Sequence, residues 1–268
     1  MATVEGQRVD GVSSRGTGQC APTMPIMKWK AYLEGDEFDV DALIRLLGNG
    51  ATTVGRDEHG PYLASDKLDA HDDATALPKI AADLVCRING IAAVRDSSFR
   101  PVSLTDRYQN QVTQTATVFA EVHLEGRGQL SVGAFSLGSS GTASPPPPSQ
   151  AYLNLADSEK NVADALTILG GPTPTTWKDL YDVFEIVRDD VGGPDAFRKR
   201  QWWSKSDESA FTGSANRPDV SGRQARHARV RGQRPKRTLD LGEGRDMISV
   251  LVARWIESHL KAQAGPST

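Results

Sequence analysis

The feature that most restricts how this chain can fold is a run of four prolines in the sequence SSGTASPPPPSQ, residues 139–150. Proline has no backbone donor and a fixed φ angle, so consecutive prolines form a semi-rigid, extended spacer. Strand-like alternation dominates before this run, and helical periodicity dominates after it. For a chain of 268 residues we therefore predict two domains joined by a Pro-rich linker at residues 139–150.

Residues 26–138 are predicted to form an α+β domain that consists of an antiparallel sheet and two helices. The first helix, residues 36–47, has Asp39 as a candidate N-cap. The second, residues 76–88, is expected to end at Asn89-Gly90. The remaining predicted elements are a hairpin at residues 52–65, strands at 27–34, 99–105, 113–124 and 128–138, and a turn at 125–128.

Residues 151–262 are predicted to form an all-α helical bundle. Two of its helix starts have the spacing of a capping box, in which a side chain in the first turn reaches back to the N-cap residue. These pairs are Thr176 with Asp179, and Asp240 with Glu243. The predicted helices are residues 157–169, 176–191, 195–203, 220–230 and 240–260.

Both ends of the chain are predicted to lack regular structure. Residues 1–25 are rich in Gly and Ser and have no apolar stretch of the kind that a secretory signal needs, so we expect a disordered leader. Residues 263–268 are expected to be a frayed tail. No apolar run is long enough to cross a bilayer, and two cysteines, Cys20 and Cys86, do not make a disulfide framework. These features favour a cytoplasmic protein with no membrane partner.

The sequence predicts no cofactor and no metal site. The glycines that begin at Gly48 follow a helix pattern and lack the third glycine of a dinucleotide-binding loop. The acidic cluster at residues 66–73 has no regular ligand spacing. Its carboxylates are explained by the start of the helix that follows, where negative charge is stabilising.

A strongly basic segment precedes the last predicted helix. From Arg198 to Arg237 the chain has 12 Lys/Arg and 3 Asp/Glu, a formal charge of +9, whereas the whole chain is at −3 and the remainder is therefore at −12. Arginine dominates over lysine, and its planar fork suits bidentate contact with phosphate. This asymmetry favours an anionic partner, and nucleic acid above all, over a merely solvated face.

The basic segment supplies candidate nucleic-acid contacts of two kinds. The adjacent indoles of Trp202 and Trp203 are of the type that stacks bases, although packing in the core is an equally good explanation for one of them. The cationic side chains would contact phosphates. The predicted cationic contacts are Arg217, Arg229, Arg231, Arg234, Lys236 and Arg237.

The same segment holds a candidate catalytic group. On a helix at residues 220–230, Arg223 and His227 are four residues apart and share one face. Neighbouring guanidiniums disfavour a charged imidazole, which suits a general base near neutral pH. Arg223 and Arg226 would contact the phosphate and stabilise the transition state, and Asn216 would position it. The alternative for His227 is a hydrogen bond that fixes the loop.

The helical half resembles a known family. A helix that carries a glutamate (LYDVFEIV, with Glu185), a turn with Asn, Arg and His227, and a long amphipathic helix are similar to the HEPN domains of prokaryotic defence and toxin systems. The resemblance covers residues 151–262 and implies a helical bundle, a homodimer, and metal-independent RNA cleavage or plain RNA binding. The family's Arg-to-His spacing is longer than the three residues that separate Arg223 from His227.

The leading hypothesis is therefore an RNA-binding protein with metal-independent ribonuclease activity that uses His227. Two alternatives stay open. In the first, the basic segment is a non-enzymatic module that docks onto an acidic protein partner. In the second, the acidic remainder of the chain neutralises the segment internally, through carboxylates such as those of Asp179, Asp182 and Glu185.

Overall fold

The structure is a computed structural model that describes residues 27–119, 149–227 and 234–264. Several predictions lie wholly or partly outside these residues. They are the leader, the end of the strand at 113–124, the turn at 125–128, the strand at 128–138, most of the Pro-rich linker, the end of the helix at 220–230 and the last residues of the tail. None of the helices in the described residues combines the length and the apolarity that a membrane span requires.

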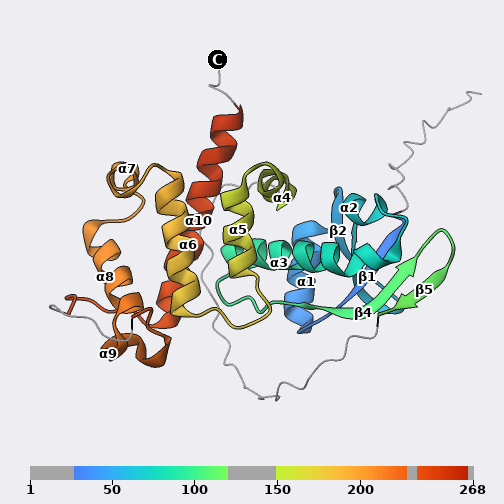
Figure 1. Ribbon diagram of the computed structural model, residues 1–268, viewed down its shortest axis with the longest axis horizontal. Helices are drawn as coiled ribbons and strands as arrows, with labels where there is room; N and C mark the ends of the chain where they lie inside the picture. The colour runs from blue at the N-terminus through green and yellow to red at the C-terminus, as the bar shows by residue number, and fades with distance from the viewer. Residues whose placement is uncertain (1–26, 120–148, 228–233, 265–268) are drawn as a thin grey trace, which may run out of the picture.

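Five antiparallel strands form one sheet in the order β2-β3-β1-β4-β5 (Figure 1). Successive side chains of the central strand β1 point to opposite faces of the sheet. Within the sheet Ala31 pairs with Leu63 of β3 on one side and with Tyr108 of β4 on the other. Helices of the first half cover the face that presents Ala31 and Leu33. The predicted α+β fold, an antiparallel sheet followed by a helical region, is confirmed. The strands are β1 Trp29–Glu34, β2 Thr52–Asp57, β3 Gly60–Ser65, β4 Ser103–Asn110 and β5 Thr115–Val118.

The opposite face of the sheet carries a polar network around Tyr32. The Tyr32 ring is only 2% exposed, and its hydroxyl lies 3.1 Å from Oδ2 of Asp57 and 2.7 Å from Oε1 of Gln109. Lys30 pairs with the same Asp57 oxygen at 2.7 Å. The guanidinium of Arg107 lies 4.8 Å from the Tyr32 ring centre. Among the described residues, this face is therefore closed around Tyr32 by hydrogen bonds and charge pairs.

The first half contains two long helices and two single turns. Asp36, and not the predicted Asp39, caps the first helix, because the Asp36 carboxylate accepts a hydrogen bond from the amide of Phe38 at 3.0 Å. The Asp39 side chain lies inside the first turn and accepts from the amide of Arg100 at 3.2 Å. The elements are α1 Glu37–Leu47, α2 Asp66–Asp69, η1 Ala74–Ala76 and α3 Leu77–Arg95.

The expected end of α3 at Asn89-Gly90 is wrong, because the helix continues through both residues to Arg95. Asn89 is buried, and its amide nitrogen donates to the carbonyls of Val102 (2.9 Å) and Gly170 (3.3 Å). Gly90 is buried against α5, where an added β-carbon would lie 2.1 Å from the carbonyl oxygen of Leu166. The Asn-Gly pair thus serves a close helix crossing and does not end the helix.

The second half is helical, as predicted. Both predicted capping boxes are present, since Thr176 and Asp179 exchange hydrogen bonds, as do Asp240 and Glu243. Two helices were not predicted, namely the one that begins at Ser149 and the one that ends at Asn216. The elements are α4 Ser149–Ser158, α5 Lys160–Leu169, α6 Trp177–Asp190, α7 Pro194–Arg200, α8 Lys205–Asn216, α9 Pro218–Ser221, η2 Gly222–Gln224 and α10 Leu241–Ala264.

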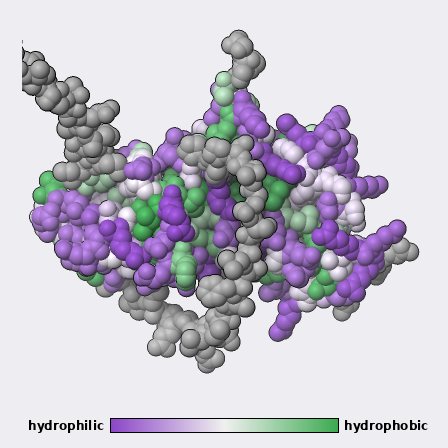
Figure 2. Space-filling model, turned by 180° about the vertical axis from the view of Figure 1, so that it is seen from behind, coloured by the Kyte–Doolittle hydropathy of each residue, from purple (hydrophilic) through white to green (hydrophobic). Residues whose placement is uncertain are grey.

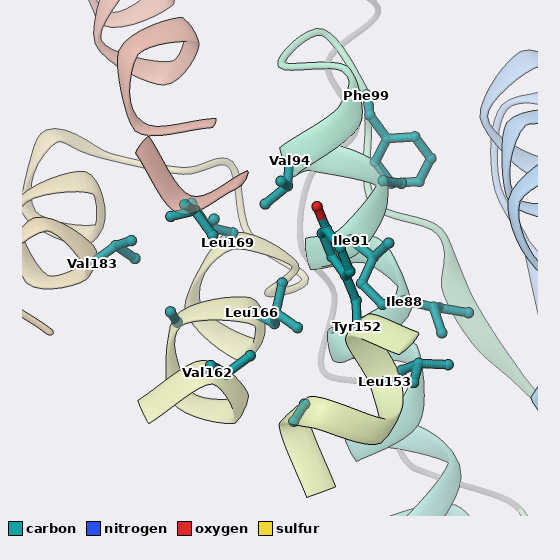
Figure 3. Packing of buried hydrophobic residues seen from close by; sticks show 14 of the residues in the cluster. Ile88, Ile91, Val94, Phe99, Tyr152, Leu153, Val162, Leu166, Leu169 and Val183 are labelled. Carbon is teal, nitrogen blue, oxygen red and sulfur yellow. The ribbon is translucent and has the colours of Figure 1, made fainter. Parts of the chain in front are cut away.

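A single buried cluster joins the two halves of the described chain. Figure 3 shows Ile88 and Ile91 of α3 beside Tyr152 of α4 and Leu166 of α5. The carboxylate of Asp190, at the end of α6, accepts from the indole nitrogen of Trp255 in α10 at 2.8 Å. Helices that follow the proline run therefore pack against a helix that precedes it.

Candidate nucleic-acid interface

The described part of the basic segment, residues 198–227 and 234–237, lies at the end of the molecule far from the sheet (Figure 1). It begins in the last turn of α7 and continues through α8, α9 and η2 towards α10. A capping box between Ser204 and Asp207 starts α8. Seen from behind, the end that carries these helices is on the right and is largely hydrophilic (Figure 2).

The two tryptophans of the basic segment pack against the protein itself. The Trp203 ring stacks on Phe184, with centroids 5.3 Å apart and an interplanar angle of 6°, and also contacts Phe197 and Phe211. Trp202 lies edge-on to Phe197, and its carbonyl accepts from Arg254 at 2.7 Å. The core-packing alternative therefore describes Trp203, whose ring face is already occupied by Phe184.

Arg226 fastens the loop after η2 to helix α6. Its guanidinium pairs with Glu185 at 3.1 Å and lies 4.3 Å from the ring centre of Tyr181. Its backbone amide donates to the carbonyl of Ala215 at 2.8 Å. The internal neutralisation considered from the sequence thus holds for this arginine. Tyr181 was not predicted to take part, and its position four residues before Glu185 on α6 is the signal that could have identified it.

Three further arginines of the basic segment are paired with nearby carboxylates. Because these carboxylates lie within the segment, part of its charge is compensated locally. The hydrogen bond and charge of Arg217 hold the pKa of Asp219 below its usual value. The pairs are Arg198 with Glu208 (3.3 Å), Arg217 with Asp219 (3.0 Å) and Arg237 with Asp207 (3.3 Å).

Six other cations of the basic segment are exposed and lack such a partner. Among the described residues, no carboxylate oxygen lies within 4.0 Å of their charged nitrogens. We call them the unpaired cations. Three of them, Lys199, Arg200 and Lys205, were predicted only as part of the charge count. The unpaired cations are Lys199, Arg200, Lys205, Arg223, Arg234 and Lys236.

The predicted helix at residues 220–230 does not form in the part of it that the structure describes. Pro218 starts the single turn α9, Gly222 ends it with φ of +59°, and the chain leaves η2 in extended backbone at Ala225. Arg223 and His227 therefore do not share a helix face, although both are exposed. This local structure follows from a proline and a positive-φ glycine four residues apart.

The other predicted site residues divide into two groups. Asn216 ends α8, and its Oδ1 atom is buried without a hydrogen-bond partner among the described residues. Arg229 and Arg231 lie outside the described residues. Of the four predicted catalytic residues, Arg226 pairs with Glu185, whereas Arg223 and His227 are exposed to solvent.

No protein-family model matches this chain, and comparisons with curated proteins and with solved structures found no significant match.

Proposed function

We propose that this protein binds RNA through the basic segment, Arg198–Arg237. The observation that supports the proposal best is the set of six unpaired cations, all exposed on one segment of a chain whose net charge is −3. A polyphosphate backbone offers closely spaced negative charges that such a set can neutralise, with release of counterions. RNA is the proposed nucleic acid because the sequence motifs of residues 151–262 resemble those of HEPN domains.

Binding would be measured by fluorescence anisotropy with a labelled single-stranded RNA at several salt concentrations. For single strands the slope of log K against log salt is about −0.7 for each neutralised phosphate, so contact by all six cations predicts a slope of about −4. The triple variant Arg223→Gln, Arg234→Gln, Lys236→Gln should reduce this slope by about 2 and weaken binding at every salt concentration.

A matched control removes the same charge elsewhere. Arg45, Lys79 and Lys261 are exposed and lie outside the basic segment, so their triple Gln variant should bind RNA as the unmodified protein does. Equal losses in the two triple variants, or no binding at low salt, would exclude this surface as the RNA site. Stronger binding of DNA of the same sequence would overturn the assignment to RNA. A pull-down after nuclease treatment tests the acidic-protein alternative, because only a protein partner survives it.

Cleavage is the second part of the proposal. His227 is an exposed imidazole next to Arg226, and it would act as a general base on the attacking hydroxyl while exposed guanidiniums hold the phosphate. His227→Ala should abolish RNA cleavage in the presence of a chelator and leave the melting temperature unchanged. His59→Ala is the control, since His59 is an exposed histidine of the sheet half. Undiminished cleavage by the His227 variant would rule out this base.

A further inference from the structure

A cavity of about 310 Å³ lies where three segments of the chain meet. The loop between α3 and β4 contributes residues 97–101, and the first turns of α10 contribute Arg245 and Ser249. The loop between α5 and α6 contributes Pro172, Pro174 and Thr175. Phe99 and Leu169, which line the cavity, are seen from close by in Figure 3. The cavity therefore lies between the sheet half and the helical half, a frequent position for small-molecule sites.

The charge of the cavity wall is one-sided. Among the described residues that line it there are two arginines, Arg100 and Arg245, and no acidic side chain. The nearest carboxylate along α10, Asp246, accepts a hydrogen bond from the hydroxyl of Ser97 and is not part of the wall. An anionic group that entered the cavity would thus contact two cationic side chains of the wall, while the nearby carboxylates of Asp246 and Asp96 are already hydrogen-bonded to Ser97 and Ser98.

Arg245 is the more informative of the two arginines because it is partly buried and incompletely satisfied. One of its terminal nitrogens donates to the carbonyl of Thr175 at 3.1 Å, while its Nε atom is buried and has no acceptor among the described residues. No carboxylate of the described chain lies within 4.0 Å of its guanidinium. Buried guanidiniums are normally paired, since an unpaired one carries a desolvation cost. An anion in the cavity would remove that cost.

The rest of the wall contains both polar and apolar side chains. The hydroxyl of Ser249 already donates to the carbonyl of Ala93 at 2.9 Å, so its oxygen is held in place beside the cavity. Phe99, Leu169 and Leu180 supply apolar surface. A volume of about 310 Å³ is at the small end of the range for ligand sites, roughly 300 to 1,000 Å³. The cavity therefore suits a small molecule that combines an anionic group with an apolar body.

We propose that this cavity binds a small organic anion, whose carboxylate or phosphate group accepts hydrogen bonds from Arg245 and whose apolar body contacts Phe99 and Leu169. Arginine recognises both oxyanions through the same planar fork. The site is separate from the basic segment, and its test does not depend on RNA binding.

Calorimetric titration of the full chain tests the proposal with three probes of similar size: phenyl phosphate, benzoate and uncharged benzyl alcohol. At least one of the two acids should bind saturably with one site per chain, and the stronger of them identifies the preferred oxyanion. Benzyl alcohol should not bind. Failure of both acids at millimolar concentration, or equal binding of the alcohol, would overturn the proposal.

The variant Arg245→Gln should weaken binding of the acidic probe at least about ten-fold, because a charge-assisted hydrogen bond is lost. Arg254→Gln is the matched control, since Arg254 lies on the same helix and contacts Trp202 instead of the cavity. Unchanged binding by the Arg245 variant would exclude its guanidinium as the anion contact.

A second variant covers the case in which Arg245→Gln does not fold. Ser98 is exposed at the cavity wall, so Ser98→Trp should obstruct the cavity and abolish binding while Arg245 stays intact. Undiminished binding by Ser98→Trp would place the probe elsewhere. Hydrogen exchange on the unmodified protein should show protection of the amides of residues 97–100 and of Thr175 when the acidic probe is added, and protection confined to other segments would contradict the site.

Discussion

Replacing Gly170 with alanine tests the contact at which α3 and α5 cross. A β-carbon at position 170 would lie 1.9 Å from the carbonyl oxygen of Cys86 and 2.3 Å from the amide nitrogen of Gly90. Both atoms belong to the backbone of α3, so no side-chain rotation can relieve the clash. Gly170 has φ of −102°, which alanine adopts freely, and backbone strain at that residue is therefore not the issue.

The magnitude follows from the cost of overpacking. Extra methyl groups in a well-packed core cost about 1–3 kcal/mol, and the upper end applies here because two helices must separate. A loss of about 3 kcal/mol corresponds to a fall in Tm of roughly 6–12 °C for a chain of this size. Chemical and thermal unfolding, followed by circular dichroism, would measure both quantities.

Gly171→Ala is the control, because a β-carbon there would have no neighbour nearer than 3.6 Å. The two variants differ by one position and make the same chemical change. The Gly171 variant should be within about 0.5 kcal/mol of the unmodified protein. If the two variants unfold alike, the close approach of α3 and α5 is refuted.

Two further predictions concern pH. Burial and then the hydrogen bond with Asp57 raise the pKa of Tyr32 from 10.0 to about 12. The contribution of the neutral Tyr32 hydroxyl to the free energy of unfolding should therefore be fully present below pH 10.0 and be lost as pH rises towards 12. In denaturant titrations Tyr32→Phe should flatten this alkaline decline, and identical alkaline profiles of the two proteins would contradict it. Burial raises the pKa of Asp190, but hydrogen bonds, including those from Trp255 and His259, outweigh it and hold the pKa below its usual value. The difference in free energy of unfolding between the unmodified protein and Asp190→Asn should therefore be largest above about pH 4 and shrink as pH falls further. A constant difference down to about pH 2 would argue against the hydrogen-bond network around Asp190.

Local signals in the sequence predicted much of the fold. The exchange of hydrogen bonds between Thr176 and Asp179 requires only residues three apart, and so does that between Asp240 and Glu243; both helix starts were predicted correctly. The same signal is present at Ser204 and Asp207 and would have identified α8. Helix α4 was missed because the linker was extended over its first residues, including Ser149.

Features set by distant residues were not predictable. Nothing near Gly90 in the chain shows that Leu166 will approach it, so an Asn-Gly pair was interpreted as a helix end. In the candidate site, the charge of the basic segment was evident, but the partners of its side chains were not. Trp203 finds Phe184, and Arg226 finds Glu185, only after α6 and α8 have packed together. The cavity at Arg245 is likewise assembled from segments that are remote in the sequence.

The burial of α3 between neighbours from both sides of the proline run has a consequence for limited proteolysis. Cutting the backbone within residues 139–148 would break the covalent link between the two halves of the chain. The buried cluster that contains Ile88 and Leu166 would stay intact. The two pieces should then migrate together on a sizing column and separate only in denaturant, as a nicked molecule does. A fragment that ends at residue 138, expressed alone, would expose to solvent the apolar face of α3 that α5 covers in the full chain. Such a fragment should precipitate.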